Sequence, residues 1–361
     1  MSIFTAQSET FLKKYLNNHS PTGFESSGQQ IWIDYLKEYI DNWESDAYGT
    51  AYGIINPGKD FKVVIEAHAD EISWFVNHIT DKGFIHVVRN GGSDPLIAPS
   101  KRVHVHTADG MVKGVFGFPA IHVRDAESKI QAKTHTIFID VGASSKQEVL
   151  DMGIHAGCVA TFDDEIDVLN DKWYVGRALD NRMGGFCIAQ VARLIKEQNI
   201  DLPYSLYIVN SVQEEVGLRG AEMIANTIAP DLAIITDVTH DTGTPMMNAK
   251  KQGDIKGGEG PSITYAPAIH YKLLHEVIAA AESNEIPLQR EASSRRTGTD
   301  TDAFAYSNKG VPSVLISLPL RYMHTTVEMV HKTDMENVSL LILETLKRIQ
   351  PDKNLFKYLV K

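Results

Sequence analysis

The sequence predicts an α/β protein whose main domain is interrupted by a β-rich insertion. Apolar runs typical of buried strands, such as Val63 to Ile65 and Leu206 to Val209, alternate with amphipathic helical patterns near both ends of the chain. From residue 72 to residue 171 the pattern changes to short β-rich pieces separated by turn signals. We therefore expect one domain built from residues 1–71 and 172–361, and a second, inserted domain from residues 72–171.

The first domain begins with a helix and with a strand that carries a histidine. Residues 28–41 place Ile31, Tyr35 and Leu36 at helical spacing, which predicts a helix with one buried face. The turn signal NPGKD precedes FKVVIEAHADE, whose apolar centre predicts a strand buried on both faces. His68 therefore falls at the carboxyl end of that strand.

The insertion consists of short strands. Its β-rich pieces are 74–79, 84–89, 102–107, 111–117 and 134–143. In RVHVHT the two valines alternate with His104 and His106. Ser145 and Glu148 have capping-box spacing, which predicts one short helix. We expect a small β-barrel or sandwich.

Helices and apolar strands alternate again after residue 172. A stripe through Met183, Cys187 and Val191 predicts a long helix that packs by one face. Central strands are expected at 205–210, 231–238 and 313–318, and helices at 270–283 and after residue 334. The C-terminal half thus completes the α/β domain.

The composition excludes several classes of function. The 361 residues are 43% hydrophobic and 22% charged, and a net charge of -11 argues against nucleic acid, because phosphate binding needs clustered Lys and Arg. No segment approaches the apolar length of a membrane span, and the N-terminus lacks a leader pattern, so we expect a cytoplasmic protein without a membrane partner. Cys158 and Cys187 are expected to be buried free thiols.

Five polar motifs stand at predicted strand ends. Ligand sites of open α/β sheets lie at the carboxyl ends of strands, so these motifs can converge although they are distant in sequence. Taken singly, each also has a structural explanation as a loop histidine, a helix N-cap or a solvated turn. The motifs are His68 in EAHADE, Asp180 in RALDNR, Glu214 and Glu215 in VQEEVG, Asp237 in IITDVTH, and His324 in RYMHTT.

As a set, these side chains suit a centre with two divalent ions. Two imidazoles and several carboxylates without a thiolate favour Zn, with Co or Mn as alternatives. Asp180 is the natural bridging carboxylate. The two half-sites are then completed by His68 with Asp237 and by His324 with Glu215.

Two further acids are assigned supporting roles. Glu214 is left without an ion and is the candidate general base, because metal-assisted hydrolysis needs a group that takes a proton from water. Asp70 can accept a hydrogen bond from the His68 ring and fix its tautomer, although a simple turn acid is the alternative.

The same motifs resemble those of a known enzyme family. AHADEIS, ALDNRMGG, QEEVGLRGA, DVTH and RYMHT, with a β insertion between the first two, are similar to motifs of dinuclear metallo-aminopeptidases of the tetrahedral aminopeptidase and glutamyl (deblocking) aminopeptidase family. The resemblance implies a three-layer α/β/α metallopeptidase domain with a mixed, phosphorylase/hydrolase-like central sheet, interrupted by a small all-β dimerisation domain. It also implies metal ligands at the five positions above with Glu214 as base, a cis peptide between Asp180 and Asn181, and a homo-oligomer, a tetrahedral dodecamer built from dimers.

The segment SSRRTGTDTDAF is where relatives of this family shape the substrate pocket. Its two arginines can offer a cationic pocket to acidic N-terminal residues, although arginines in loops are usually solvated. Thr299 and Asp302 have capping-box spacing and predict a helix start. The candidates for substrate binding are Arg295, Arg296, His240 and Arg321.

The sequence is compatible with three functions. The leading hypothesis is a metal-dependent aminopeptidase acting on peptides with a free N-terminus. A metal-independent glycoside hydrolase of endoglucanase type is the alternative enzyme, but its two carboxyls must flank one bond about 5 to 9 Å apart, which suits the adjacent Glu214 and Glu215 badly. A non-catalytic assembly protein on the same scaffold would lack a ligand or the base, and none is missing.

Overall fold

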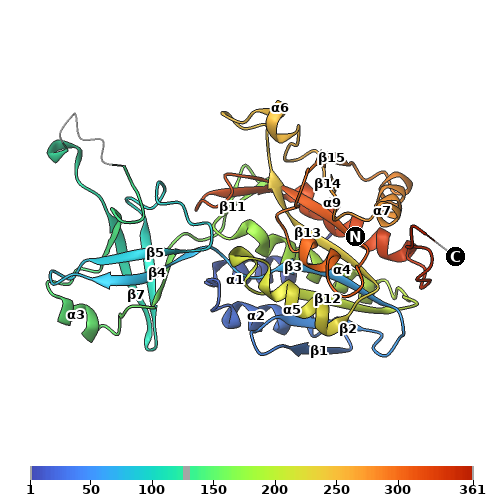
Figure 1. Ribbon diagram of the computed structural model, residues 1–361, viewed down its shortest axis with the longest axis horizontal. Helices are drawn as coiled ribbons and strands as arrows, with labels where there is room; N and C mark the ends of the chain where they lie inside the picture. The colour runs from blue at the N-terminus through green and yellow to red at the C-terminus, as the bar shows by residue number, and fades with distance from the viewer. Residues whose placement is uncertain (1, 125–130, 360–361) are drawn as a thin grey trace.

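The structure is a computed structural model that describes residues 2–124 and 131–359, and it has two parts (Figure 1). The main lobe is a large mixed sheet with helices on both faces, and a closed β-barrel stands beside it, at the left of the view. Each part has its own cluster of buried apolar side chains. The predicted α/β fold with a smaller β unit is confirmed.

The helices begin and end as follows. In the main lobe they are α1 (Ala6–Asn17), α2 (Ser26–Leu36), α4 (Leu179–Glu197), α5 (Arg219–Ile228), α6 (Ala249–Gln252), α7 (Tyr271–Ser283), α8 (Thr301–Ala305) and α9 (Lys332–Arg348). The insertion contains α3 (Lys146–Asp151), and short 3-10 turns form η1 (Ile121–Val123) and η2 (Glu214–Val216). None of the described helices combines the length and the apolar character needed to cross a bilayer.

The large sheet is mixed. Its strands are β1 (Asn42–Ser45), β2 (Ala51–Ile55), β3 (Lys62–His68), β10 (Asp167–Leu169), β11 (Trp173–Gly176), β12 (Ser205–Ser211), β13 (Leu232–His240), β14 (Ser262–Tyr265), β15 (Gln289–Ala292), β16 (Ser313–Arg321) and β17 (Glu328–His331). They follow the order β1-β2-β12-β3-β13-β16-β17-β11-β10, and β14 pairs with both β15 and β16. The central strands β12, β3, β13 and β16 are parallel, so their carboxyl ends share one edge.

Helices cover both faces of this sheet, because adjacent residues of a strand point to opposite sides. Ala67 of β3 lies against α4, where a Cβ added at Gly184 would be 3.1 Å from the Ala67 Cβ. The neighbouring Glu66 points the other way and accepts a hydrogen bond from Ser211, which also contacts Asp300 before α8. α4 and α8 therefore lie on opposite faces, with α1, α2 and α9 packed around α4 and with α5 beside α8.

The helix α4 is buried on all sides from Leu179 to Ile195, whereas the sequence predicted a helix that packs by one face only. Every residue from Leu179 to Ile195 is buried, because α4 lies between the sheet and the helices α1, α2 and α9. Its polar side chains have internal partners. The Arg182 guanidinium donates to the Asn18 carbonyl at 2.6 Å and lies over the Tyr15 ring. A pattern of apolar positions alone does not reveal such buried polar residues.

The barrel closes through six strands. They are β4 (Ser73–Ile79), β5 (Ile85–Asn90), β6 (Arg102–Thr107), β7 (Gly110–Gly117), β8 (Phe138–Asp140) and β9 (Val159–Phe162). Val103 and Val105 are fully buried in its core, as their alternation predicts, whereas His104 and His106 face His19 of the main lobe, with ring centroids 5.1 and 5.3 Å away. The strand β10 lies within the predicted insertion 72–171 but pairs with β11 of the large sheet.

Two local predictions have different outcomes. Ser145 caps α3 by accepting from the Glu148 N–H at 3.2 Å, as expected. The helix start predicted near Thr299 is confirmed, since α8 begins at Thr301, but the capping box is wrong, because the Asp302 carboxylate instead accepts the backbone N–H of Thr297 at 3.0 Å. Both cysteines are free and buried.

Candidate metal centre

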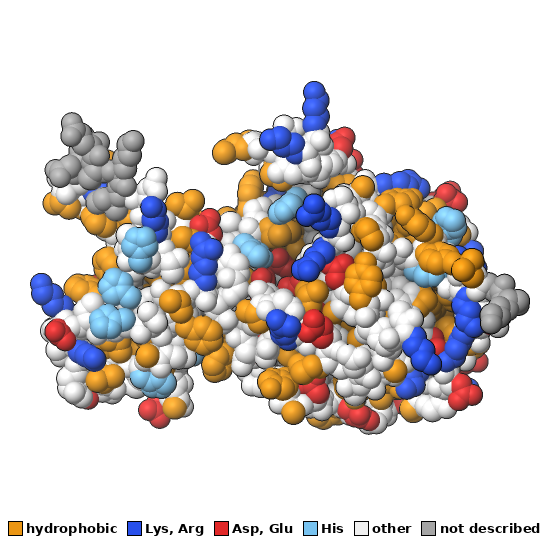
Figure 2. Space-filling model, viewed as in Figure 1, with side chains coloured by type: hydrophobic (Ala, Val, Ile, Leu, Met, Phe, Trp, Pro, Cys, Tyr) orange, Lys and Arg blue, Asp and Glu red, His pale blue; other side chains and the backbone are white. Residues whose placement is uncertain are grey.

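The five predicted motifs converge at one edge of the large sheet. His68 is the last residue of β3, and Asp237 lies in β13 near its carboxyl end. Glu214 and Glu215 form the turn η2 directly after β12, and His324 follows β16. Since these four strands are parallel neighbours, their ends bring residues from distant parts of the sequence together. In Figure 2, acidic side chains lie in a hollow of the surface, and Lys, Arg and His side chains surround it.

The converging side chains form two groups that share Asp180. In each group the possible ligand atoms all lie within 4.8 Å of one another. The His68 Nε2 atom lies 3.1 Å from Asp180 Oδ1 and 3.8 Å from Asp237 Oδ1. The His324 Nε2 atom lies 3.4 Å from Asp180 Oδ2 and 3.3 Å from Glu215 Oε1. Asp180 thus offers one carboxylate oxygen to each group.

Unusual backbone conformations aim these side chains. Ala178, Gln213 and His324 have positive φ values of 57°, 57° and 61°, which non-glycine residues seldom adopt and which cluster at functional sites. The peptide bond between Asp180 and Asn181 is cis, as the resemblance implies. Left-handed residues thus lie two positions before Asp180, one position before Glu214, and at His324 itself.

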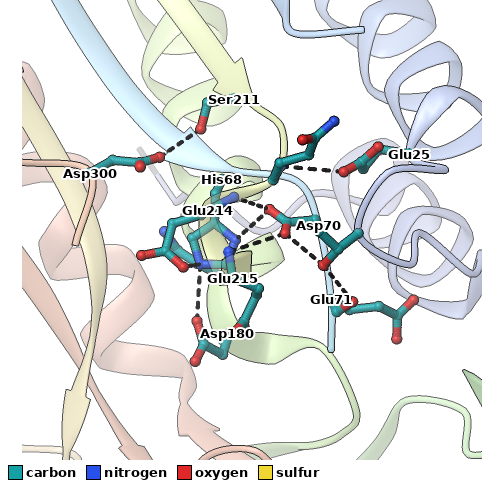
Figure 3. A network of polar contacts seen from close by, with 12 residues as sticks. Glu25, His68, Asp70, Glu71, Asp180, Ser211, Glu214, Glu215 and Asp300 are labelled. Carbon is teal, nitrogen blue, oxygen red and sulfur yellow. Dashed lines mark hydrogen bonds and ion pairs between the residues drawn. The ribbon is translucent and has the colours of Figure 1, made fainter. Parts of the chain in front are cut away.

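Asp70 lies behind the cluster and holds two of its segments (Figure 3). Its Oδ1 atom is 3.3 Å from His68 Nδ1 and accepts the Glu214 N–H at 3.0 Å. Its Oδ2 atom accepts the Glu215 N–H at 3.2 Å and the Thr22 hydroxyl at 2.8 Å. Asp70 therefore fixes the His68 ring together with the turn that carries both glutamates.

Glu214 is placed beside both groups but belongs to neither. Its Oε2 atom is 4.0 Å from His68 Nε2, and 11% of its side chain is exposed. Burial, opposed by His68 and reinforced by Asp300 and Asp237, raises the Glu214 pKa to about 10. The positive charge of ions held by the two groups would favour the ionised form of Glu214, which can accept a proton.

The donor set and its charge fit divalent cations. Within the described residues, the only basic nitrogens within 4.0 Å of Asp180, Glu215 and Asp237 belong to His68 and His324. Burial opposes protonation of His324, but hydrogen bonds to Asp180 and Glu215 raise its pKa to about 11. Burial also raises the Asp237 pKa far above its usual range. Buried carboxylates need a compensating charge, and two imidazoles with these carboxylates are ligands that Zn, Co and Mn accept.

The four predicted pocket residues have different surroundings. Arg295, Arg296 and His240 are exposed. Arg321 is engaged elsewhere, since its Nε atom lies 2.6 Å from Asp241 Oδ2 and its guanidinium lies over the Trp173 ring at 4.1 Å. The structure gives these residues no common partner among the described side chains, so their role in substrate binding stays a prediction.

Sequence reasoning missed three residues that contact the cluster. Thr22 bonds to Asp70, Gly92 lies against the His324 ring, and Glu328 accepts hydrogen bonds from the segments that carry Asp180 and His324. Only Glu328 could have been noticed in the sequence, because it is an acidic residue four positions after His324. The other two are recognisable only once the fold is known.

A mixed α/β sheet that gathers two imidazoles and several carboxylates at its parallel strand ends is typical of hydrolases with a metal centre. Residues 49–341 match the M42 glutamyl aminopeptidase family, and the chain belongs to this family. It is therefore a peptidase, a hydrolase of peptide bonds.

Individual relatives are similar over nearly the whole chain. A lysyl aminopeptidase of Pyrococcus furiosus is 33% identical over 350 residues, covering 94% of this chain and 97% of that protein. The structure of a TET aminopeptidase from a Thaumarchaeota archaeon of marine sediment has a TM-score of 0.91 at 29% identity, covering 96% and 98% of the two chains. The TET1 peptidase of Pyrococcus horikoshii, described as assembling into a tetrahedron or a large octahedral shell, has a TM-score of 0.82 at 28% identity, covering 93% and 98%.

Proposed function

We propose that the chain is a metal-dependent aminopeptidase with two divalent ions per subunit, of which Zn is the first choice and Co or Mn the alternatives. The observation that carries the proposal is the pair of ligand groups that share Asp180. One ion would be held by His68, Asp180 and Asp237, and the other by Asp180, Glu215 and His324. Ions bound there would supply Lewis acidity toward the scissile carbonyl and toward water.

The protein's own groups would move the proton. Glu214 is the general base: its carboxylate takes a proton from the attacking water and passes it to the amine that leaves. Asp70 supports this step in two ways, because it orients the His68 ring and holds the Glu214 backbone at 3.0 Å. General acid–base catalysis of this kind contributes about 10²- to 10⁴-fold to a rate.

The reaction is tested with aminoacyl p-nitroanilides in the presence of Zn, Co or Mn, with a β-glucan assayed in parallel. We expect cleavage of the anilides that a chelator abolishes, and that a defined metal restores, with no glucan cleavage. Chelator-insensitive glucan cleavage would instead support the glycoside hydrolase. Absence of any turnover together with absence of bound metal would support the non-catalytic assembly protein.

The preferred N-terminal residue is proposed to be acidic. Arg295 and Arg296 are exposed in the loop before α8, and within the described residues no ion pair involves them, so they are available to a substrate carboxylate. A relative named as a lysyl aminopeptidase makes the opposite preference the natural competitor. Replacing both arginines by Ala should lower kcat/KM for a glutamyl substrate and leave an alanyl substrate unchanged. Preferred cleavage of a lysyl substrate by the wild type would reject this part of the proposal.

The chain is further proposed to form a homo-oligomer through its barrel, as dimers that assemble into a tetrahedral dodecamer. Several large apolar side chains of the insertion are exposed to solvent, and their burial between subunits would stabilise a dimer. They are Val88, Met111, Val115, Ile121 and Val123. Analytical ultracentrifugation should give a mass near twelve chains, and a Met111→Lys, Val115→Lys variant should sediment as smaller species. A monomeric wild type would contradict the assembly.

A further inference from the structure

Glu328 joins the two backbone segments that carry Asp180 and His324. It is the first residue of β17, and its side chain is almost completely buried. Its Oε2 atom accepts the N–H groups of Leu179 at 2.8 Å and Asp180 at 3.2 Å. Its Oε1 atom accepts the His324 N–H at 2.7 Å. One carboxylate thus bonds to two segments that are far apart in the sequence.

The first of these segments needs an outside partner. The first N–H groups of a helix have no acceptor within the helix and are usually satisfied by the side chain of the N-cap residue. Ala178, which precedes α4, has no side-chain acceptor and a left-handed backbone, and the non-helical φ and ψ angles of Asp180 and Asn181 interrupt the first turn. Glu328 supplies the missing acceptor and thereby fixes the start of α4, where Asp180 lies.

The second segment is a loop that would otherwise be weakly determined. His324 lies between β16 and β17 with φ at 61°. Glu328 holds its N–H, and the backbone of Gly92 from the barrel closes the other side of its ring. A Cβ added at Gly92 would lie 2.5 Å from the His324 ring, so this contact admits only glycine without a shift. His324 is therefore fixed in two ways: Glu328 accepts its backbone N–H, and Gly92 packs against its ring.

A carboxylate is the side chain that suits this position. It has only acceptor atoms, so both oxygens can face N–H groups at once. A glutamine of the same shape would turn an NH₂ group toward one of the two segments and leave a buried donor opposed by another donor. Glu328 would act by positioning the backbone, because its hydrogen bonds are to backbone N–H groups and not to the side chains proposed to bind ions or move the proton.

We infer that Glu328 is a positioning residue that sets the separation of Asp180 and His324, and with it the affinity of the His324 side of the centre for a divalent ion. The inference rests on the proposed metal centre. Asp180 Oδ2 and His324 Nε2 are 3.4 Å apart, and Glu328 is the side chain bonded to the backbone of both residues. Groups that orient metal ligands contribute about 10- to 100-fold to metal affinity or activity.

The test is a titration of the metal-free, full-length protein with Co²⁺ alone, followed by calorimetry and by the visible absorption of the bound ion. Glu328→Gln should weaken the binding of one of the two ions about 10- to 100-fold, and should weaken the other less. The absorption spectrum of the weaker site should change, which a purely structural loss of stability would not produce. At saturating Co²⁺, turnover of a peptide anilide should recover toward the wild-type value.

Asp334→Asn is the matched control. Asp334 is also a buried carboxylate, and it accepts the backbone N–H groups of Gly258 at 2.6 Å and Gly260 at 2.9 Å, but it contacts none of the proposed ligands. This variant should lose stability toward urea and keep both Co²⁺ affinities. If Glu328→Gln does not fold, Glu328→Asp is measured instead, since it keeps the charge but is one methylene too short to reach both segments.

Wild-type Co²⁺ affinities and spectrum in the folded Glu328 variant would overturn the inference, and so would an equal loss in Asp334→Asn. A failure of the proposed function is distinguishable, because the wild-type chain itself would then bind fewer than two ions or cleave no peptide.

Discussion

Replacing Asp70 by Asn tests whether the hydrogen bonds behind the cluster organise it. The Asp70 Oδ1 atom lies 3.3 Å from His68 Nδ1 and accepts the Glu214 N–H, and its Oδ2 atom accepts the Glu215 N–H and the Thr22 hydroxyl. An asparagine with its oxygen at the Oδ1 position keeps the first two contacts. The new NH₂ group then takes the place of Oδ2. The Thr22 hydroxyl can rotate to accept a hydrogen bond from it, but the Glu215 N–H loses its acceptor and faces another donor.

The expected magnitudes follow from this count. One buried donor without an acceptor costs about 1–3 kcal/mol of unfolding free energy. The loss of negative charge behind His68 should lower metal affinity or kcat about 10- to 100-fold. Thr22→Val is the control, because it removes only the hydroxyl on the side of Asp70 away from His68. It should cost about 1 kcal/mol and leave kcat unchanged.

Urea unfolding, a metal titration by calorimetry, and turnover of a peptide anilide at saturating metal measure these effects on the same preparations. The reasoning is refuted if Asp70→Asn keeps wild-type kcat and metal affinity, since the His68 ring would then not depend on Asp70. It is also refuted if Thr22→Val reduces kcat as strongly, since the effect would then reflect loosening of the fold near the site.

Three further perturbations have defined outcomes. Phe186→Ala in the fully buried α4 should lower the urea unfolding free energy by about 3–5 kcal/mol, and a loss below 1 kcal/mol would contradict the close packing of that helix. Gly92→Ala should reduce Co²⁺ affinity measured by calorimetry, because its Cβ would lie 2.5 Å from the His324 ring, and an unchanged affinity would show that the barrel loop can shift. Burial, reinforced by Arg177, lowers the His19 pKa from 6.5 to about 3, so its contribution to stability is complete above pH 6.5 and is lost as the pH falls toward 3. Between pH 7 and 5 the unfolding free energy of the wild type should therefore fall about 1–2 kcal/mol more than that of His19→Gln, and parallel pH profiles would show that His19 titrates normally.

The convergence of the two histidines and three acids could be predicted because it follows from a general property of parallel sheets. His68 and Asp237 end strands that the hydrophobic pattern identifies, and neighbouring parallel strands bring such ends together. The number of imidazoles and acids predicts two equal sets around one shared carboxylate, and Asp180 was proposed for that position. The two groups in the structure have this composition.

Asp70 could be proposed as a partner of His68 from its nearby position, but Thr22 and Glu328 could not be predicted, because their contacts join distant segments. Thr22 and Asp70 are 48 residues apart, and Glu328 bonds to Leu179 across 149 residues. No local pattern marks such a pair as close. The same reason explains the incorrect capping box at Thr299, since Asp302 satisfies loop N–H groups whose position depends on the folded loop.

The partners of long surface side chains are the feature that the sequence determines least. Arg321 was expected at the edge of a substrate pocket, yet its guanidinium is paired with Asp241 and stacked on Trp173. Long charged side chains reach several partners from one backbone position, and the sequence does not fix which partner is chosen. The exposed Arg295 and Arg296 therefore need the substrate panel to define their role.

The central claim is that two ions share Asp180 while Glu214 stays outside the ligand set and acts as the base. Metal content and turnover measured on one preparation of Glu214→Gln test it most directly. We expect two ions per chain, as in the wild type, with kcat lowered about 10²- to 10⁴-fold. Wild-type turnover in this variant, or the loss of one ion, would contradict it.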